Sequence, residues 1–460
     1  MTDTFRNQVA ELLNNDYTFG GLYATKLSGS VKAVFISHNG ALKILECQIQ
    51  SGEAPSIADL VPSNWDEREA HDLYQISFNG HSPLRPLVEH DPISDHWTVA
   101  VKGSDVYQIA VGPIHAGIIE SGHFRFHVIG DRILFLDTQL FYKYRGLEIA
   151  AENKTLHEGK RYVERMCMGC SVANALAYVQ ACEEIIGYIP SAKLRILRTV
   201  LLELERLWNH LNDIAAICAG VGMSLGNQIF LVLSERIRRL NFSLTGHRYL
   251  SGTIDIGEIK PVLTADNIEN IRSELESVRL RAKEAWRELI FNSSFAARLE
   301  GVGVVDTAQI RRLGAVGPAA RAAGLKEDFR AHSTKLDYEN FEAVIPENPK
   351  GDVRSRLEQR YLEFLQSTEI IFRLIRKTDI LTDEETACEP KPLGIGITES
   401  ARGRTLCIVE ASEGRIERLH MRTGSYANWS AVAYAAVGNL LPDFPLINKS
   451  FELCYACSDR

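Results

Sequence analysis

Hydrophobic periodicity predicts a bundle of long helices in the middle of the chain. Between residues 160 and 300, apolar residues recur every three to four positions over three long stretches, 192–219, 231–250 and 268–289. This spacing puts the apolar side chains on one face of a helix, as in a helix bundle. Further helices are expected at 353–377 and 426–440, and shorter ones at 5–13 and 65–74.

Alternating and β-branched runs predict strands in other parts of the chain. Between residues 97 and 137, the runs WTVAVKG, VYQIAVG, HFRFHVIG and DRILFLD are separated by glycine-containing turns. That arrangement is typical of a small antiparallel sheet. Two more strands are expected at 31–37 and 41–48, around the turn His38-Asn39-Gly40, and another two at 405–410 and 415–421.

These elements together predict an α+β protein. A small N-terminal α+β domain comes first, followed by a small antiparallel sheet and a large, mainly α-helical bundle. The proline-rich segment 81–86, followed by Asp91-Pro92, is typical of an extended linker. We therefore expect two domains, 1–95 and 96–460, and a chain of 460 residues with 45% apolar residues can bury cores of this size.

Charge and targeting signals narrow the function classes. The net charge of -8 shows no basic surplus, which argues against nucleic acid as a partner. The first residues lack the basic start and apolar block of a signal peptide. No stretch approaches the roughly 18 uncharged apolar residues that a membrane span needs. We expect a cytoplasmic chain without a transmembrane segment, which reaches a membrane only through partner subunits.

Cysteine spacing provides the first candidate chemistry. The nine cysteines include two Cys-x-x-Cys pairs, Cys167/Cys170 and Cys454/Cys457. The first pair precedes a helical pattern, and a helix N-terminus favours the thiolate, which is the form that binds metals. Structural zinc or a redox pair would explain such spacing as readily as a catalytic metal. Zinc ribbons, however, place their pairs within a few tens of residues, whereas residues 171–453 separate these two pairs. The other five cysteines are expected to be buried structural thiols.

Several motifs carry a resemblance to a known family. From residue 97 onward, the chain resembles the large subunits of membrane-bound, energy-converting (group 4) nickel-iron hydrogenases of the formate hydrogenlyase type, which are related to the quinone-site subunit of respiratory complex I. Residues 1–95 resemble the 30-kDa subunit of complex I. The matching stretches are 112–126, 144–148, 164–170, 204–213, 399–403 and 454–460, with 65–74 and 80–85 in the N-terminal part.

The resemblance implies a cofactor and an activity. The four cysteines would hold one Ni-Fe centre, with Cys167 and Cys454 terminal on nickel, and Cys170 and Cys457 bridging to an iron that carries CO and cyanide. Soft sulfur ligands suit these metals. The implied reaction is the reversible, heterolytic interconversion of 2H⁺ + 2e⁻ with H₂. In this family a maturation protease removes a tail behind the second pair, and a chain that ends at Arg460 would match the mature form.

Two catalytic residues and a set of partners follow from the same resemblance. Arg402 would place its guanidinium over the open metal position, and Glu120 would relay protons. Without the resemblance, Arg402 would be interpreted as a solvated charge and Glu120 as a capping residue. Electrons would be exchanged with an iron-sulfur small subunit that carries a 4Fe-4S cluster. Membrane subunits of a complex I-like assembly would hold the chain peripherally on the cytoplasmic side of the membrane.

Some positions depart from the family pattern. Asn174 stands where a histidine usually follows the first pair, Glu452-Leu453 replaces Asp-Pro, and Ser400-Ala401 replaces a segment in which proline precedes the arginine. Cys407 lies near a usual histidine position. These changes affect the expected rate and direction rather than metal binding.

Two histidines and two other functions remain open. His115 and His210 match positions near the quinone pocket or the core of complex I relatives, but a hydrogen-bonded structural histidine explains each equally well. The alternative functions are a complex I-like quinone or coupling subunit without Ni-Fe, and a scaffold subunit with structural zinc. The four cysteines argue against the quinone subunit, because quinone-binding relatives have lost them.

Overall fold

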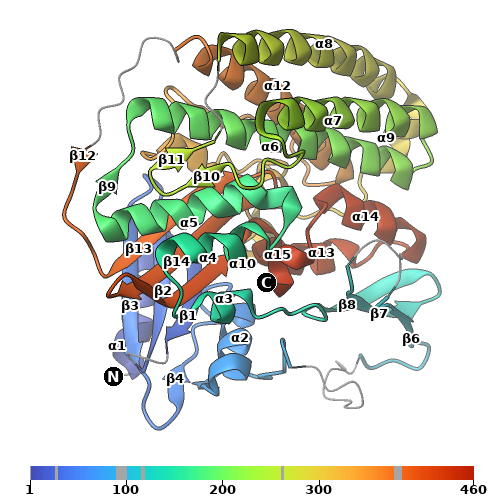
Figure 1. The fold of residues 1–460 in the computed structure, drawn as a ribbon. Coiled ribbons are helices and arrows are strands. Elements are labelled where there is room, and N and C mark those ends of the chain that lie inside the picture. The colour runs from blue at the N-terminus through green and yellow to red at the C-terminus, as the bar shows by residue number, and fades with distance from the viewer. Residues whose placement is uncertain (1, 26–28, 90–100, 115–119, 261–263, 378–385) are drawn as a thin grey trace.

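A computed structural model describes residues 2–25, 29–89, 101–114, 120–260, 264–377 and 386–460 (Figure 1). Its N-terminal part contains a three-stranded antiparallel sheet in the order β1-β2-β3, and a parallel pair, β4 and β5. Its elements are α1 (Thr2–Asn14), β1 (Tyr17–Thr25), β2 (Ser30–Ser37), β3 (Leu42–Gln48), β4 (Glu53–Pro55), α2 (Asn64–Tyr74) and β5 (Ser77–Asn79). The predicted boundary at residue 95 lies outside the described residues, so the division 1–95 and 96–460 stays a prediction.

The second sheet confirms three of the four strands expected before residue 137. It is antiparallel, in the order β6-β7-β8. The strands are β6 (Tyr107–Val111), β7 (His123–Ile129) and β8 (Arg132–Gln139). Residues 97–100 of the remaining predicted strand lie outside the described residues, and 101–103 form no strand.

Long helices make up the centre of the molecule, as the periodicity predicts. In Figure 1, α5, α6, α7, α8 and α12 are stacked across its upper half. The helices in this part are α3 (Leu147–Ala151), α4 (Leu156–Glu164), α5 (Ser171–Ile186), α6 (Ala192–Gly220), α7 (Ser224–Thr245), α8 (Ala265–Ile290), α9 (Ser293–Leu299), α10 (Thr307–Leu313), α11 (Pro318–Arg321) and α12 (Val353–Leu374). Short strand pairs join their ends: β9 (Tyr188–Ile189) with β12 (Thr386–Ala387), and β10 (Ile254–Asp255) with β11 (Glu258–Ile259).

A third antiparallel sheet and three helices complete the fold. The sheet has the order β13-β14-β15 and packs against α5. Its strands are β13 (Leu393–Ser400), β14 (Gly403–Ser412) and β15 (Arg415–Arg422), and the helices are α13 (Gly424–Ala436), α14 (Phe444–Phe451) and α15 (Ala456–Asp459). Figure 1 shows the C-terminal end of the chain in the middle of the molecule, next to α15.

Three apolar clusters hold these parts together. The largest joins the helices to the second and third sheets, and a smaller one fills the N-terminal part. The third cluster lies between the N-terminal sheet and the third sheet, where Val34 and Ile36 pack with Ile397, Leu406 and Ile408. Burial of apolar surface of this kind is the main favourable term in folding. The N-terminal part is therefore docked on the rest of the chain through a core of its own.

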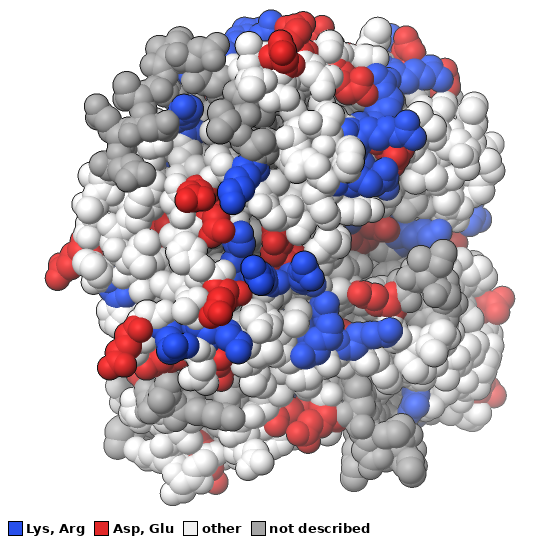
Figure 2. All heavy atoms as spheres, in the orientation of Figure 1, with Lys and Arg blue, Asp and Glu red and all other residues white. Residues whose placement is uncertain are grey.

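The architecture confirms the α+β class. Within the described ranges, no helix is both long enough and apolar enough to cross a membrane. On the face shown in Figure 2, Lys and Arg side chains lie among Asp and Glu side chains.

Candidate metal centre

The two Cys-x-x-Cys pairs converge in the structure. The Sγ atoms of Cys167 and Cys454 are 3.0 Å apart. The Sγ atoms of Cys167, Cys454 and Cys457 all lie within 4.8 Å of one another, and the Cys170 thiol hydrogen-bonds with Cys167 and Cys457. Four sulfur atoms therefore gather within the reach of shared metal ions, although 287 positions separate Cys167 from Cys454.

Burial distinguishes an inner from an outer cysteine in each pair. Cys170 and Cys457 are buried, with 4% and 0% of their surface exposed. Cys167 and Cys454 are only partly buried. The outer pair is therefore the one that a small molecule can approach.

Of the four cysteines, Cys167 is the one whose surroundings favour the thiolate form. Hydrogen bonds from Cys170, and then from Cys454 and Cys457, hold the pKa of Cys167 well below its usual range. The pKa values of the other three cysteines lie well above the usual range of a thiol. The largest cause is the hydrogen bond that each of them makes with Cys167. A metal that takes all four as thiolates must therefore displace thiol protons.

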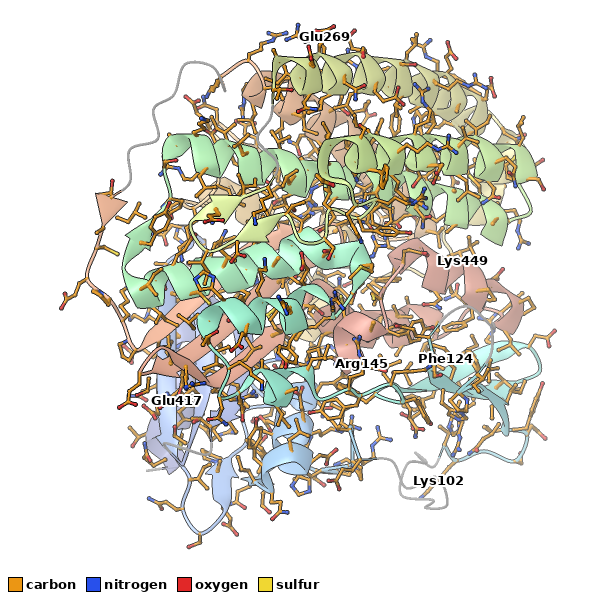
Figure 3. All side chains as sticks on the ribbon, viewed as in Figure 1. Lys102, Phe124, Arg145, Glu269, Glu417 and Lys449 are labelled. Carbon is orange, nitrogen blue, oxygen red and sulfur yellow. The ribbon has the colours of Figure 1, made fainter. Side chains whose placement is uncertain are left out.

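Arg145 joins the two cysteine-bearing segments. Its Nη1 donates to the carbonyl of Arg165 at 3.1 Å and its Nη2 to that of Met166 at 2.7 Å, just before Cys167. The same Nη2 reaches the carbonyl of Ala456, which lies between Cys454 and Cys457, at 3.5 Å. Figure 3 shows Arg145 beside α15. Arg145 belongs to the motif 144–148, but sequence reasoning gave it no role.

Hydrogen bonds from α13 fix the second pair. The Cys454 N–H donates to Ser425 Oγ, and Thr423 Oγ1 donates to the Cys457 carbonyl, both at 3.0 Å. Between the two cysteines, the ring of Tyr455 packs against Trp429 at 4.9 Å and Phe124 at 6.5 Å between centroids. Figure 3 shows Phe124 on the second sheet, so the orientation of this pair depends on several elements.

A tight hairpin turn presents Arg402. Ser400 pairs with Gly403 across β13 and β14, which leaves Ala401 and Arg402 as the two turn residues. Gly424 lies against this turn, and a Cβ atom there would come within 2.8 Å of the backbone of Arg402. Since backbone atoms cannot move aside cheaply, residue 424 must be glycine for the turn to keep its position.

Arg402 lies beside the sulfur cluster. Its Nη1 and Nη2 donate to the two carboxylate oxygens of Asp213 at 2.7 and 3.1 Å. Burial alone would lower the pKa of Arg402, but the charge of Asp213, followed by those of Cys170, Glu452 and Cys454, raises it. A permanently charged guanidinium with a fixed plane therefore faces the cysteines.

Glu120 also comes to the cluster. It is half-buried, and its carboxylate accepts a hydrogen bond from the Ala456 N–H. Burial, and then the charge of Cys167, raise its pKa. The structure thus brings together the six site residues that the sequence predicts, while their roles stay predictions. His115 lies outside the described residues.

Two acidic residues of α6 were missed as site residues. Glu205 and Asp213 are spaced eight residues apart, so they lie on one face of the helix, with Asn209 between them. The Asn209 amide donates to the carbonyl of Gly169, between Cys167 and Cys170, at 2.8 Å. The four-residue spacing of Glu205, Asn209 and Asp213 along α6 was the signal that could have identified this face.

Glu205 has an unusual environment. Its carboxylate accepts the N–H groups of Val172 and Ala173, at 2.6 and 3.1 Å, in the first turn of α5. Burial raises its pKa to about 8, an effect increased by Cys167 and opposed by these two N–H groups. The folded chain therefore holds a proton on Glu205 up to about pH 8, whereas the unfolded chain releases it near the ordinary glutamate pKa of 4.5.

Glu205→Gln is expected to flatten the pH dependence of stability. Between pH 4.5 and about 8 unfolding releases this proton, so the free energy of unfolding falls as pH rises through that window. From about pH 5 to 8 the free energy of unfolding should fall roughly 3 to 4 kcal/mol more in the metal-free parent than in the variant. Urea unfolding at several pH values measures the difference. Parallel profiles would mean that the folded chain keeps Glu205 ionised.

His210 belongs to a buried charge network behind Arg402. Its Nε2 lies 2.9 Å from Glu363 and its Nδ1 lies 3.9 Å from Asp213, and all three side chains are fully buried. Arg360 also reaches Asp213, at 3.4 Å. The interpretation as a hydrogen-bonded core histidine fits these contacts. Glu363 in turn pairs with Arg321 at 2.8 Å, so the network extends deeper into the core.

The structure shows the surroundings of the residues that depart from the family pattern. Asn174 is buried in the first turns of α5, and within the described part of the chain its Oδ1 and Nδ2 have no hydrogen-bond partner. Burial, and then Asp213, raise the pKa of Glu452 to about 7. Ser400 Oγ accepts the N–H of Arg402 at 3.1 Å, so it supports the turn. Cys407 is fully buried on β14. The effects of these residues on catalysis stay predictions.

Comparisons with known proteins give two family matches. Residues 227–392 match the family of the respiratory-chain NADH dehydrogenase 49 Kd subunit, and residues 8–98 match that of the 30 Kd subunit. Formate hydrogenlyase subunit 5 of Escherichia coli is 28% identical over 90% of this chain and 78% of its own length. An NADH-quinone oxidoreductase subunit of Chloroherpeton thalassium is 31% identical over 72% of this chain and 82% of its own.

A solved structure supports the fold. One chain of the membrane-bound sulfane sulfur reductase, an archaeal respiratory membrane complex, superposes with a TM-score of 0.70 at 25% identity. The match covers 77% of this chain and 99% of the other.

Proposed function

We propose that this chain is the metal-bearing large subunit of a nickel-iron hydrogenase. The chain belongs to the family of the 49-kDa subunits of respiratory NADH dehydrogenase and their hydrogenase relatives, such as formate hydrogenlyase subunit 5. The observation that carries the proposal is the convergence of both cysteine pairs beside the Arg402–Asp213 ion pair. A structural zinc site needs only the four sulfur atoms. Zinc binding would not require a buried, fixed guanidinium next to these sulfur atoms.

The cysteines fit a bimetallic centre. Soft thiolate ligands suit nickel and iron, and the partly exposed Cys167 and Cys454 leave one side of the cluster accessible. Cys167 and Cys454 would hold the centre on its accessible side, and the buried Cys170 and Cys457 would hold it on the side of the core. When bound, such a centre with CO and cyanide on its iron supplies the interconversion of hydrogen with protons and electrons.

The surrounding residues would orient the reactants and move protons. Arg402 presents a permanent positive charge beside Cys454 and Cys170, which favours negative charge developing on that side of the site. Asp213 keeps the guanidinium plane fixed through two hydrogen bonds. Glu120 would exchange a proton with the Cys167 Sγ, because burial and the charge of Cys167 raise its pKa and so favour the protonated carboxyl group.

The assembly is proposed on the same basis. Electrons would pass to a small subunit with a 4Fe-4S cluster. Membrane subunits would hold the chain at the cytoplasmic face, as the solved relative comes from a membrane complex and no helix in the described ranges could span a membrane.

Elemental analysis and infrared spectroscopy of the purified complex test the proposal together. The expected result is about one nickel and one iron per chain, with stretching bands of CO and cyanide. Zinc alone would support the scaffold function. Quinone binding by a complex that holds no metal at the cysteines would support the coupling-subunit function.

Glu120→Gln is expected to slow proton transfer without removing the metals. The amide keeps the size of the side chain and still accepts from Ala456 N–H, but it cannot carry a proton. Hydrogen production and hydrogen–deuterium exchange should fall about 100-fold, while nickel and iron contents stay the same. Glu417→Gln serves as the control, since Figure 3 shows Glu417 far from α15. Unchanged exchange in Glu120→Gln would assign the proton path to another group.

A further inference from the structure

We propose that the N-terminal part of the chain is a structural component of the metal centre, and that Glu69 of α2 is a positioning residue for Cys454 and Cys457. The inference rests on the proposed function only in taking these two cysteines as metal ligands. Glu69 lies in the part of the chain that matches the 30 Kd subunit family, outside the match to the 49 Kd family.

Arg460 is the contact between the two parts. Only 1% of its surface is exposed. Its Nη2 donates to Glu69 Oε2, and its Nη1 donates to Glu148 Oε1 at 2.8 Å. The guanidinium also lies over the ring of Tyr426, 4.8 Å from the centroid, and the Tyr426 hydroxyl donates to the same Glu69 oxygen at 3.0 Å. A buried cation is thus held between carboxylates from both parts of the chain.

A short, rigid path connects Arg460 to the sulfur atoms. The Arg460 N–H donates to the carbonyl of Ala456 at 3.1 Å, so Arg460 caps the C-terminal end of α15. The Asp459 carboxylate accepts the N–H groups of Phe141 and Lys143, at 2.7 and 3.0 Å. Cys457 therefore lies within one helical turn of a residue whose side chain the N-terminal part holds.

The acidic face of α2 makes a second contact with the C-terminal part of the chain, besides the one to Arg460. Asp66 and Glu69 are three residues apart, so they project from the same side of the helix. Asp66 Oδ1 accepts from Arg422 Nε at 3.0 Å, and Arg422 is the last residue of β15, directly before the turn into α13. One face of α2 thus holds Arg460 and also the start of the helix that fixes Cys454 and Cys457.

The acidic groups around Arg460 do not need a metal ion. Oxygen and nitrogen atoms of Glu69, Glu148 and His420 lie within 4.8 Å of one another, a spacing that a metal could use. Arg460 already supplies positive charge to both carboxylates, and Arg418 lies 3.2 Å from Glu148. Removing one member of such a buried group leaves the others uncompensated, so the structure is sensitive to each of them.

Glu69→Gln tests the inference in the metal-free full-length chain, with Co²⁺ as the probe. Absorption from thiolate to cobalt reports how many thiolates bind. The parent should give the spectrum of a four-thiolate site. Glu69→Gln should bind cobalt about 10-fold more weakly, the lower end of the range for groups that hydrogen-bond to the ligands themselves, because Glu69 acts on the cysteines through Arg460 and α15. Glu11→Gln, an exposed change on α1, should bind cobalt like the parent.

Thiol alkylation separates local positioning from general destabilisation. In Glu69→Gln, iodoacetamide should modify Cys454 and Cys457 at least about 10-fold faster than in the parent, while the buried Cys182 and Cys218 stay protected. Tyr426→Phe removes only the hydroxyl that donates to Glu69 and should shift both measurements in the same direction, by less. It replaces Glu69→Gln if that variant does not fold.

The outcomes distinguish the two proposals. Parent-like cobalt binding and alkylation in both variants would overturn the role of Glu69 and leave the proposed function intact. Equal acceleration at all buried cysteines would also overturn it, because that pattern indicates loss of stability alone. A parent chain with a four-thiolate cobalt spectrum, a response to Glu69→Gln, and no nickel or iron in the native complex would support the positioning role and refute the hydrogenase.

Discussion

Cys457→Ser is expected to abolish the proposed hydrogenase activity and to prevent assembly of the proposed bimetallic centre. Cys457 is fully buried and its thiol hydrogen-bonds with those of Cys167, Cys170 and Cys454. Serine keeps the shape but offers a hard, weakly acidic oxygen in place of soft sulfur. Loss of an outer-shell partner typically costs 10- to 100-fold in metal affinity or activity, so loss of a direct ligand should cost more than about 100-fold.

The measurement is hydrogen production together with the nickel and iron contents of the purified complex. Cys388→Ser is the matched control, because Cys388 is a single cysteine that is exposed, so the prediction of a buried thiol was wrong there. It should keep both metals and full activity. Retention of nickel, iron and the CO and cyanide bands in Cys457→Ser would show that the centre is held by other residues.

Arg402→Lys is expected to lower the turnover rate by about 100- to 1,000-fold while both metals stay bound. Lysine keeps the charge, but it cannot donate in parallel to both oxygens of Asp213, so its position beside the cysteines is no longer fixed. The infrared bands of the iron ligands should keep their intensity. Asp213→Asn should give a smaller loss, because the guanidinium stays but one of its two acceptors becomes a donor.

Two further results would decide the role of Arg402. Arg415→Lys, an exposed change at the start of β15, is the control and should leave the rate unchanged. If Arg402→Lys lost the metals as well as the activity, Arg402 would be a structural support of the cluster. If Arg402→Lys retained full activity, a positive charge at residue 402 would be enough for catalysis, and its fixed position would not be required.

The long central helices and the cysteine pairs could be predicted from the sequence. The periodicity predicted α6, α8 and α12 within a few residues, and the spacing of the cysteines identified both pairs. The helix expected at 231–250 instead runs from Ser224 to Thr245, and Gly246, with a positive φ, ends it. A glycine at that position is a common stop signal, but the apolar pattern continued past it.

Strands β1 and β13 could not be predicted, because glycines interrupt their patterns. In β13, a Cβ atom on Gly394 or Gly396 would come within 2 Å of a carbonyl oxygen of α5. These glycines are there for close packing of a helix on the sheet, which only the folded structure reveals. Strand β1 contains Gly20-Gly21, and its register shifts between Phe19 and Gly21.

The residues that contact the site residues could not be predicted from the sequence, for a related reason. Arg402 could be identified by its motif, but its acceptor Asp213 lies 189 positions away. Arg145 and Glu69 act through contacts with segments more than 300 positions later in the chain. No local pattern encodes such contacts, since they depend on how α2, α6 and the third sheet are placed relative to one another.

The distance between the two cysteine pairs along the chain also sets an order of events during biosynthesis. When Cys167 and Cys170 leave the ribosome, the residues that complete the sulfur cluster have not yet been translated, and a metal that arrived then would find two ligands. Cys454 and Cys457 can reach their places only once the start of α13 has formed, because Thr423 and Ser425 hold that segment. Binding of a metal by all four thiolates would therefore require a chain that has been synthesised through Cys457.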